Sequence, residues 1–535
     1  MSVITAPVRG CVRGVASGVV VSAGGTPFTP TLDYNYVSTM ALGGLETFTR
    51  ASTGWYFNSA GTLTSAATDA ARFDYDPTTA RTNLILRSSN QDNAGVWTAG
   101  QVSVTADTVT DPLGTTTADT LTENSGSTSR GTLQGVAIDT HVTQTFSVYA
   151  KAGSRSWLRL MLNTGADSII GWFNLATGVV GSTQVEGTGA SPVVAITDAG
   201  SGWYRCALTG IPASADSGTI QAFIRMATAD SEFSYQGNGT GTLHLWGAQL
   251  ETGSSATAYI ATAGSAVTVC TARGLLLEGA RTNLFLNSAV GVTQSCTVAA
   301  AANTLSFWGT GTITLTGVST AGPLVGTAAN ARVSLSFTPT AGSLTLTVSG
   351  SCTNVQLELG AYATSPIVTV GSTVTRAADV CTIATSAIPS FNAAQGAVLA
   401  DLVTLDTTTS LNAGGWLLSD GTTNNRVSLR ARNSGNAQAL IVTGGVTQIS
   451  LREAGTLTPN VATRCAVAWA TNSVAFARDG ATPLTTGTTT VPTGLTEFRL
   501  GNSNPTGTEP LNGWLRRIAY APTRADNTAL QTLTT

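Results

Sequence analysis

Charge is scarce in this chain of 535 residues. Only 10% of its residues are charged, against about 25% in ordinary globular proteins. Lys151 is the only lysine, so the other cations are arginines, and these are scattered along a chain of net charge −3. Nucleic-acid binding needs clustered cations that displace counterions. We therefore expect no nucleic-acid partner, and a surface built from hydroxyls and amides instead of charges.

Long apolar runs are also missing. The strongest candidate for a membrane or export segment covers residues 12–25. Arg9 and Arg13 precede its apolar run, and glycine interrupts that run repeatedly. It is too short to span a bilayer, so we expect no membrane partner. A weak signal peptide is one interpretation of this stretch. An N-terminal arm or a first strand fits it better.

Metal-binding patterns are absent too. The two histidines, His141 and His244, lie far apart, and none of the seven cysteines forms a Cys-x-x-Cys pair, so a structural zinc site is not expected. We expect no cofactor. Calcium would suit Asp and Asn oxygens at the edge of a sandwich, but no contiguous loop specifies it. The cysteines leave three alternatives open: buried thiols, one or two disulfide bridges, or an interchain link through Cys11.

Catalytic signatures are missing as well. The chain has no Gly-x-Ser-x-Gly elbow, no His-Glu-x-x-His pattern and no phosphate-binding loop followed by lysine. Glycoside hydrolysis needs two carboxylates facing each other across a cleft. Asp74 with Asp76, or Asp401 with Asp420, supply the residue type, but the sequence cannot pair them. Turn-forming and strand-edge roles explain Asp74, Asp76, Asp420 and Asp479 more simply. We predict that the protein is not an enzyme.

What the chain does contain is a repeat. An opening motif occurs at residues 80–86 and again at 280–286, with six of seven positions identical, and a closing motif at 249–265 matches 356–372 at a constant offset of 107. Such a pattern indicates a duplicated module. From the arginine of the opening motif to the glutamine of the closing motif the second copy is much the shorter, so one copy has lost or gained strands.

Short runs of alternating apolar and polar residues dominate both copies and the C-terminal third. Residues 145–150 and 343–348 are typical, and glycine, serine or aspartate separates such runs. Alternation with period two predicts strands that are buried on one face. Only residues 523–533 have a helical pattern. We therefore predict an all-β protein of tandem antiparallel β-sandwiches, of jelly-roll or lectin type, behind a short extended N-terminal arm.

The repeats and composition shifts divide the chain into four predicted parts. The ranges are an N-terminal anchoring arm at 1–45, a first sandwich with a leading hairpin at 46–272, a shortened second sandwich at 273–383 and a third sandwich at 384–535.

Particular motifs resemble known families. Residues 46–53, 72–77 and 80–84, and the fuller form at 274–284, resemble the opening of carbohydrate-binding-type modules found in tailed-phage virion proteins. The Asp479-Gly480 turn and residues 511–520 resemble laminin-G or concanavalin-like sandwiches. The resemblance implies sandwiches displayed on a phage particle as a tail fibre, tail spike or head appendage, often bound to surface polysaccharide.

A glycan would be held by aromatic rings against its apolar faces, with arginine and amide groups on its hydroxyls. In the first module that mixture is supplied within a short span by Arg155, Trp157, Arg159 and Trp172. Taken singly, each of the two tryptophans fits the core better than a ligand site. Both interpretations stay open at this point.

The repeated residues of the opening and closing motifs have a structural interpretation. Arg81 and Asn83 in the first copy, and Arg281 and Asn283 in the second, are expected to tie each module's start to the carboxylate of its closing motif, Glu251 or Glu358. Charges this rare should be paired when they are buried.

These observations favour a structural and adhesion protein on the exterior of a bacteriophage particle, of tail-fibre or tail-spike type. The predicted partners are other virion proteins, through residues 1–45, and a host surface glycan, and a homotrimer is expected by analogy with phage fibres. Two alternatives remain: a protein that decorates the capsid or forms a head fibre, and a spike that degrades polysaccharide.

Overall fold

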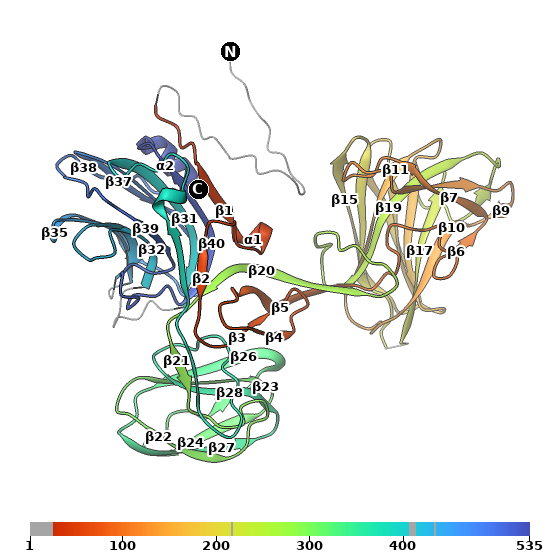
Figure 1. Cartoon of the computed structure of the whole chain (residues 1–535). Helices are drawn as coiled ribbons and strands as arrows, with labels where there is room; N and C mark the ends of the chain where they lie inside the picture. Colours follow the sequence, from red (N-terminus) through yellow and green to blue (C-terminus); the bar gives the residue numbers. More distant parts are fainter. Residues whose placement is uncertain (1–24, 216–217, 406–412, 433–434) are drawn as a thin grey trace. The chain divides into compact units, whose positions relative to one another are not determined.

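The protein is nearly all β (Figure 1). The computed structural model describes residues 25–215, 218–405, 413–432 and 435–535. Within these ranges the helices are α1 (Tyr36–Thr39), the short 3₁₀ helix η1 (Thr385–Ala387) and α2 (Asn527–Thr534), which is capped by Asp526. None of the helices in these ranges is long and apolar enough to cross a membrane. The predicted fold class, tandem antiparallel sandwiches, is confirmed.

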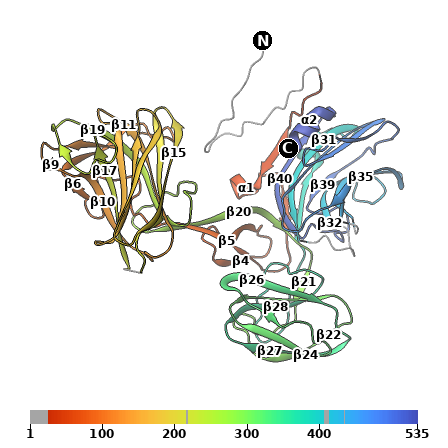
Figure 2. The same ribbon diagram turned by 180° about the vertical axis from the view of Figure 1, so that it is seen from behind.

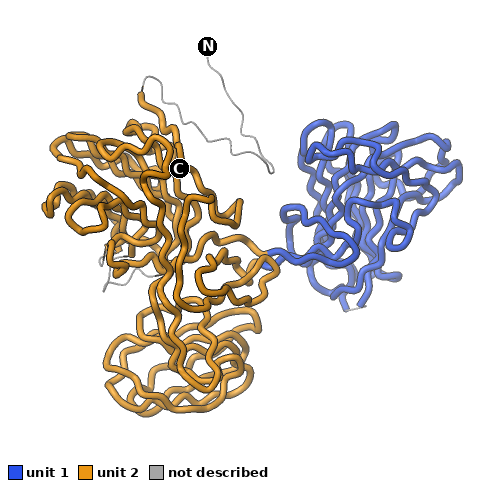
Figure 3. Tube along the Cα trace, viewed as in Figure 1, with its two compact units in different colours: residues 1–14, 80–269 blue, residues 15–79, 270–535 orange. Residues whose placement is uncertain are grey.

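The chain forms two compact units, shown in Figure 3. The first unit contains residues 80–269 and the second contains the described residues of 15–79 and 270–535. The chain enters the first unit along β5 (Phe73–Asn83) and leaves it along β20 (Val267–Leu277), and these two strands are neighbours in one sheet. The first unit is therefore inserted into the second.

The first unit is one sandwich of two antiparallel sheets. One sheet has the order β14 (Val179–Glu186), β13 (Ser168–Asn174), β12 (Trp157–Asn163), β17 (Thr219–Ala227), β10 (Arg130–Ala137), β6 (Thr98–Gly100). The other has the order β15 (Ala190–Gly200), β16 (Trp203–Ile211), β11 (Gln144–Ala152), β19 (Thr242–Thr252), β8 (Ala118–Glu123), β7 (Val102–Val109). Two short strands, β9 (Ser127–Thr128) and β18 (Tyr235–Gln236), pair beside them.

The second unit holds a large sandwich made mainly from the C-terminal third. One sheet has the path β38 (Leu484–Thr486), β37 (Ser473–Arg478), β36 (Thr463–Ala470), β31 (Gln395–Thr404), β40 (Gly513–Ala521), β20, β5, with β1 (Leu32–Asn35) also on β40. The other has the order β2 (Thr47–Thr49), β30 (Val380–Ala384), β39 (Glu497–Leu500), β32 (Ala413–Ser419), β33 (Arg426–Ala431), β34 (Asn436–Thr443), β35 (Val446–Thr456).

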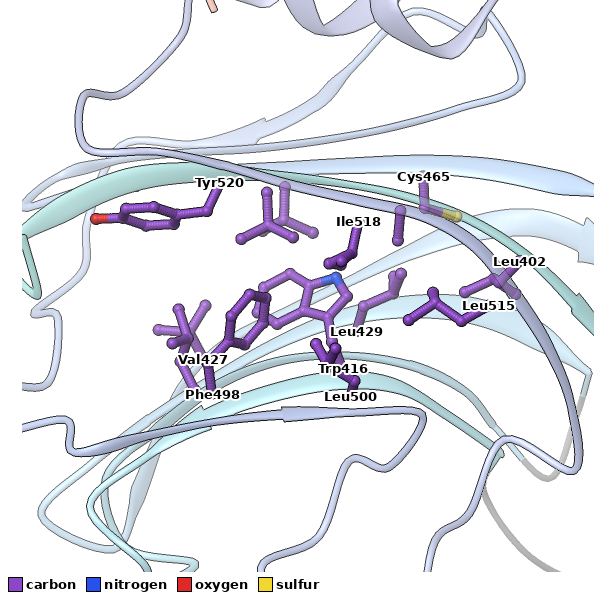
Figure 4. Close-up of a cluster of buried hydrophobic side chains, with 14 of the residues drawn as sticks. Leu402, Trp416, Val427, Leu429, Cys465, Phe498, Leu500, Leu515, Ile518 and Tyr520 are labelled. Carbon is purple, nitrogen blue, oxygen red and sulfur yellow. The ribbon is translucent and has the colours of Figure 1, made fainter. Parts of the chain in front are cut away.

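The core of this sandwich lies between its two sheets (Figure 4). Trp416 is fully buried and meets Phe498 edge to face, with ring centroids 5.9 Å apart. The outer face of the first sheet carries alanines, such as Ala466 and Ala468, against which Leu530 of α2 packs. Small side chains on that face let the helix approach the strands closely.

The second unit also holds the small sandwich of the second copy, seen from behind in Figure 2. Its sheets are β22 (Gln294–Val298), β27 (Gly342–Ser349), β24 (Thr312–Gly317), β25 (Leu324–Val325) and β26 (Ala328–Phe337), β23 (Asn303–Gly309), β28 (Cys352–Leu359). The strands β21 (Arg281–Asn283) and β29 (Val374–Arg376) close it, and the hairpin β3 (Gly54–Phe57) with β4 (Leu63–Ala66) completes the unit.

Residues 46–79 were predicted to lead the first sandwich, and the structure corrects this. A buried ion network fixes them to the second unit: Arg72 Nη2 lies 2.9 Å from Glu278 Oε2 and contacts Asp379, and Arg50 Nη1 lies 3.2 Å from Asp379 Oδ1. Arg376 Nη1 lies 2.7 Å from the same Glu278 oxygen. Because all five side chains are buried, each charge needs the others.

The predicted limits of the second sandwich and of the N-terminal arm are also wrong. Residues 275–277 of the predicted second sandwich pair with β40, and β30 joins the sheet of the large sandwich. The predicted arm, 1–45, is not extended throughout: β1 pairs with β40, and Phe28 and Tyr36 are buried. Their aromatic side chains find apolar partners on the large sandwich, which a solvated arm would not provide. Residues 1–24 lie outside the described residues.

Candidate glycan-binding face of the first sandwich

The central strand β12 separates two faces by simple alternation. Leu158, Leu160 and Leu162 are fully buried in the core between the two sheets. The side chains between them, including Trp157 and Arg159, therefore lie on the outer face of the sheet. In the strand register, Arg159 stands opposite Trp172 on β13. Three of the four predicted glycan-binding residues thus share one surface.

Two of these three residues are packed under a neighbouring loop. Trp172 is fully buried, its indole N–H donates to Glu232 O at 3.1 Å, and its ring meets Phe233 edge to face at 5.2 Å. Arg159 lies over the Phe233 ring at 4.8 Å and donates to Phe233 O and Ser129 Oγ. The core interpretation of Trp172 is therefore the correct one. Arg159 has a structural role, because it binds the loop residue Phe233.

Trp157 is only half-buried and packs against the same apolar cluster as Trp172. It remains at the surface of the face, where a ring can contact a sugar.

Arg155 belongs to a different cluster. Its guanidinium donates to Glu123 Oε1 at 2.6 Å and lies over the Tyr235 ring, and the Tyr235 hydroxyl donates to the same carboxylate. Burial would raise the pKa of Glu123, but Arg155 and the backbone N–H of Asn238 outweigh it and lower the pKa to about 2. Arg155 is thus engaged in a structural ion pair with Glu123. This position does not support its prediction as a glycan contact.

Sequence reasoning missed Arg225. This residue stands opposite Arg159 on β17, half-buried, with its guanidinium 4.5 Å from the Phe223 ring centroid. Burial, helped by the charge of Arg159, lowers the pKa of Arg225 to about 10. Within the part of the chain that the structure describes, its guanidinium has no hydrogen-bond acceptor. The alternation of residues 219–225 would have placed Phe223 and Arg225 together, but only the cross-strand register pairs them with Arg159.

Two glycines lie next to Arg225 in the sheet. Gly131 stands opposite Arg225 and Gly100 stands opposite Gly131. A Cβ on Gly131, whose φ is +146°, would lie 2.0 Å from Ile224 O, so only glycine fits this position. The two glycines therefore make room for the Arg225 guanidinium: a Cβ on Gly100 would lie 3.2 Å from its Nη1, and Gly131 itself is buried.

The face can bind an acceptor-rich ligand. Arg225 offers unused N–H donors, and Phe223 and Trp157 offer half-buried rings. Planar guanidinium groups suit carboxylates, which they bind through paired hydrogen bonds. In the described ranges no group of three or more His, Cys, Asp or Glu side chains is arranged to hold a metal ion.

In each copy the asparagine of the opening motif binds backbone groups of the closing motif and not the predicted carboxylate. Asn83 and Asn283 are fully buried, Glu251 accepts from Gln249 and Thr257, and Glu358 accepts from Gln356 and Thr364.

The arginines of the opening motifs differ between the copies. Arg281 Nε lies 3.8 Å from Glu358 Oε2, as predicted. Arg81 is exposed and donates to Ala80 O, so the predicted tie to Glu251 is wrong in the first copy. There the carboxylate is satisfied locally by the closing motif itself.

No family model matches the chain, and no curated protein does. Solved structures match parts of it. The carbohydrate-binding module CBM40 of the Ruminococcus gnavus IT-sialidase is 16% identical, with 26% of this chain and 83% of that chain covered and a TM-score of 0.24. Domain 4 of the arabinanase AbnA from Geobacillus stearothermophilus, in complex with arabinotriose, is 14% identical, with 33% and 81% covered and a TM-score of 0.25.

The LG1-3 region of the laminin alpha2 chain is 8% identical, with 75% of this chain and 97% of that chain covered and a TM-score of 0.18. Scores this low carry no argument about function.

Proposed function

We propose that this protein is an adhesion protein on the exterior of a bacteriophage particle, of tail-fibre or tail-spike type, whose first sandwich binds an acidic polysaccharide of the host surface. The observation that carries the glycan site is Arg225: a half-buried cation without an acceptor in the described chain, lying over the half-buried Phe223 ring. A sugar carboxylate would supply the missing acceptor.

The phage assignment is supported by the opening and closing motifs and by the shortage of charge, which suits a display scaffold. Attachment to other virion proteins falls to the N-terminal residues, and assembly as a homotrimer belongs to the same proposal. Residues 28–36 pack on the large sandwich, so attachment would use residues nearer the N-terminus.

A non-catalytic role is supported by the hydrogen-bond and ion-pair partners of the candidate carboxylates. Asp74 accepts from Phe57 N and from the Trp514 indole, and Asp420 accepts from Thr422 and Asn425 inside a turn. Asp401 lies 3.3 Å from Arg516 Nε and 3.7 Å from Arg464 Nε. Asp74, Asp401 and Asp420 thus each have a structural task.

The test is binding of the full chain to an array of bacterial surface polysaccharides, acidic and neutral. We expect binding to acidic members, and Arg225→Ala should weaken it about tenfold or more, since a hydrogen bond to a charged group contributes roughly 1.5–3 kcal/mol. Arg81→Ala, which removes an exposed arginine from the same sandwich, is the matched control and should bind normally. No binding to any acidic polysaccharide, or equal binding by the Arg225 variant, would overturn the proposal.

A further inference from the structure

The second unit contains a cavity of about 390 Å³ that no sequence motif indicated. Its walls include Phe57 from the hairpin, Asp76 from β5 and Arg273 from β20. Trp308 and Tyr362 of the small sandwich line it as well. The volume lies within the range of small-molecule sites in proteins.

The cavity stands at a position that both copies of the module share. In the first copy Tyr149 pairs with Arg205, and in the second Trp308 pairs with Arg332. Each arginine lies over its aromatic partner, at 5.3 Å and 4.5 Å.

The hydrogen bonds of these arginines also correspond. Arg205 donates to Thr257 O and Ser147 Oγ, and Arg332 donates to Thr364 O and Ser306 Oγ. The two sets of residues are therefore structural equivalents.

The first copy fills this position with aromatic rings. Trp246 lies 5.4 Å from Tyr149 and 4.5 Å from Tyr259, measured between ring centroids. At the offset of 107 the equivalent residues of the second copy are Thr353 and Pro366. Of these two residues Pro366 lines the cavity, and Phe57 of the hairpin faces the Trp308 ring from 5.8 Å.

Arg273 is paired with carboxylates inside the cavity. Arg273 lies 3.0 Å from Asp76 and 3.5 Å from Asp74, so its charge is already compensated. The side chains of Arg273 and Asp76 keep 30% and 24% of their surface exposed, so both can still reach a ligand. Phe57 and Tyr362 are half-buried beside them. A compensated cationic donor, carboxylate acceptors and aromatic rings match the hydroxyls and apolar faces of a neutral sugar.

We propose that the cavity is a second saccharide site, which takes the end of a short neutral oligosaccharide, and that it is open because the second copy has Pro366 where the first has the Tyr259 ring. The site is independent of the Arg225 face and differs from it in ligand class. Arg273 and Asp76 would bind hydroxyls, and Phe57 and Tyr362 would contact the sugar ring.

The test uses the full chain and an array of neutral di- and trisaccharides of glucose, galactose, mannose and N-acetylglucosamine, with affinities from ligand-observed NMR titration. We expect binding of at least one member, accompanied by a change in tryptophan emission because Trp308 and Trp514 line the cavity. Tyr362→Ala should weaken binding about tenfold, as expected for a central aromatic contact.

A second variant, Pro366→Tyr, places the residue of the first copy in the cavity wall and should abolish binding. Arg225→Ala should leave neutral-sugar binding unchanged, which separates this site from the proposed acidic-glycan face. Absence of binding to every member of the array would overturn the proposal. So would unchanged binding by Tyr362→Ala.

Discussion

Asn83 and Asn283 make the same four hydrogen bonds in their two modules. Each amide nitrogen donates to two backbone carbonyls near the module's end, of Ala248 and Ile260 in the first copy and at the equivalent positions in the second. Each amide oxygen accepts from two backbone N–H groups. One buried side chain therefore fixes the start of each module to its end.

Replacing either asparagine should destabilise its own unit alone. Asn83→Ala and Asn283→Ala each leave four buried backbone groups without partners, so we expect a loss of roughly 2–4 kcal/mol in the free energy of unfolding. Calorimetry should show a lower midpoint for the first unit in Asn83→Ala and for the second in Asn283→Ala. The exposed Asn424→Ala is the control. A loss of less than about 1 kcal/mol in the free energy of unfolding would mean that water replaces these hydrogen bonds.

The stability of the second unit should fall in acid. Burial would raise the pKa of Glu278, but Arg376 and Arg72 outweigh it and lower the pKa from 4.5 to about 2. Ionised Glu278 therefore stabilises the folded state above pH 4.5, and this contribution, on the order of 3 kcal/mol, is lost as the pH falls toward 2. Urea unfolding from pH 7 to pH 2, followed by tryptophan fluorescence, measures it.

Glu278→Gln should flatten that pH dependence, and Glu186→Gln, a change in the first sandwich, should not affect the second unit. If the free energy of unfolding of Glu278→Gln falls as steeply between pH 7 and pH 2, other carboxylates cause the effect.

The first sandwich should be removable. Thr271 N donates to Thr79 Oγ1 at 2.8 Å across neighbouring strands, so an Asn-Gly turn in place of residues 80–269 can close the gap. We expect the shortened chain to fold and to unfold within a few degrees of the second unit's transition in the full chain. By contrast, Arg72→Met should cost about 3–5 kcal/mol because it leaves buried carboxylates unpaired. An aggregated or molten deletion variant would contradict the insertion.

The six described cysteines are free thiols, so no bridge forms among them. Five are buried, and burial raises the pKa of the half-buried Cys296 to about 11. Because the thiolate is the reactive form, alkylation of the folded protein at neutral pH should be very slow at all six. Cys296 should react first as the pH rises. Peptide mapping by mass spectrometry, with a urea-unfolded sample as reference, would reveal any buried cysteine that reacts as fast as in the unfolded chain.

Local patterns predicted the strands, because alternation follows directly from burial on one face. They also predicted the asparagines of the repeat, because the duplication places the same residues in the chain twice. The boundaries were wrong where pairing is distant: Arg50 meets Asp379 and β1 meets β40, and nothing near either partner in the sequence indicates this. For the same reason Arg225 was missed, since its importance depends on the strand that lies beside it. The cavity was missed because residues far apart in the sequence line it, from Phe57 to Trp514.

The side-by-side position of Thr79 and Thr271 also has an evolutionary consequence. Any domain whose ends lie one strand spacing apart can occupy the place of the first sandwich without disturbing the ion network of Arg72, Glu278 and Asp379. Recombination at these two points would give a lineage new binding specificity in a single step, on an unchanged scaffold.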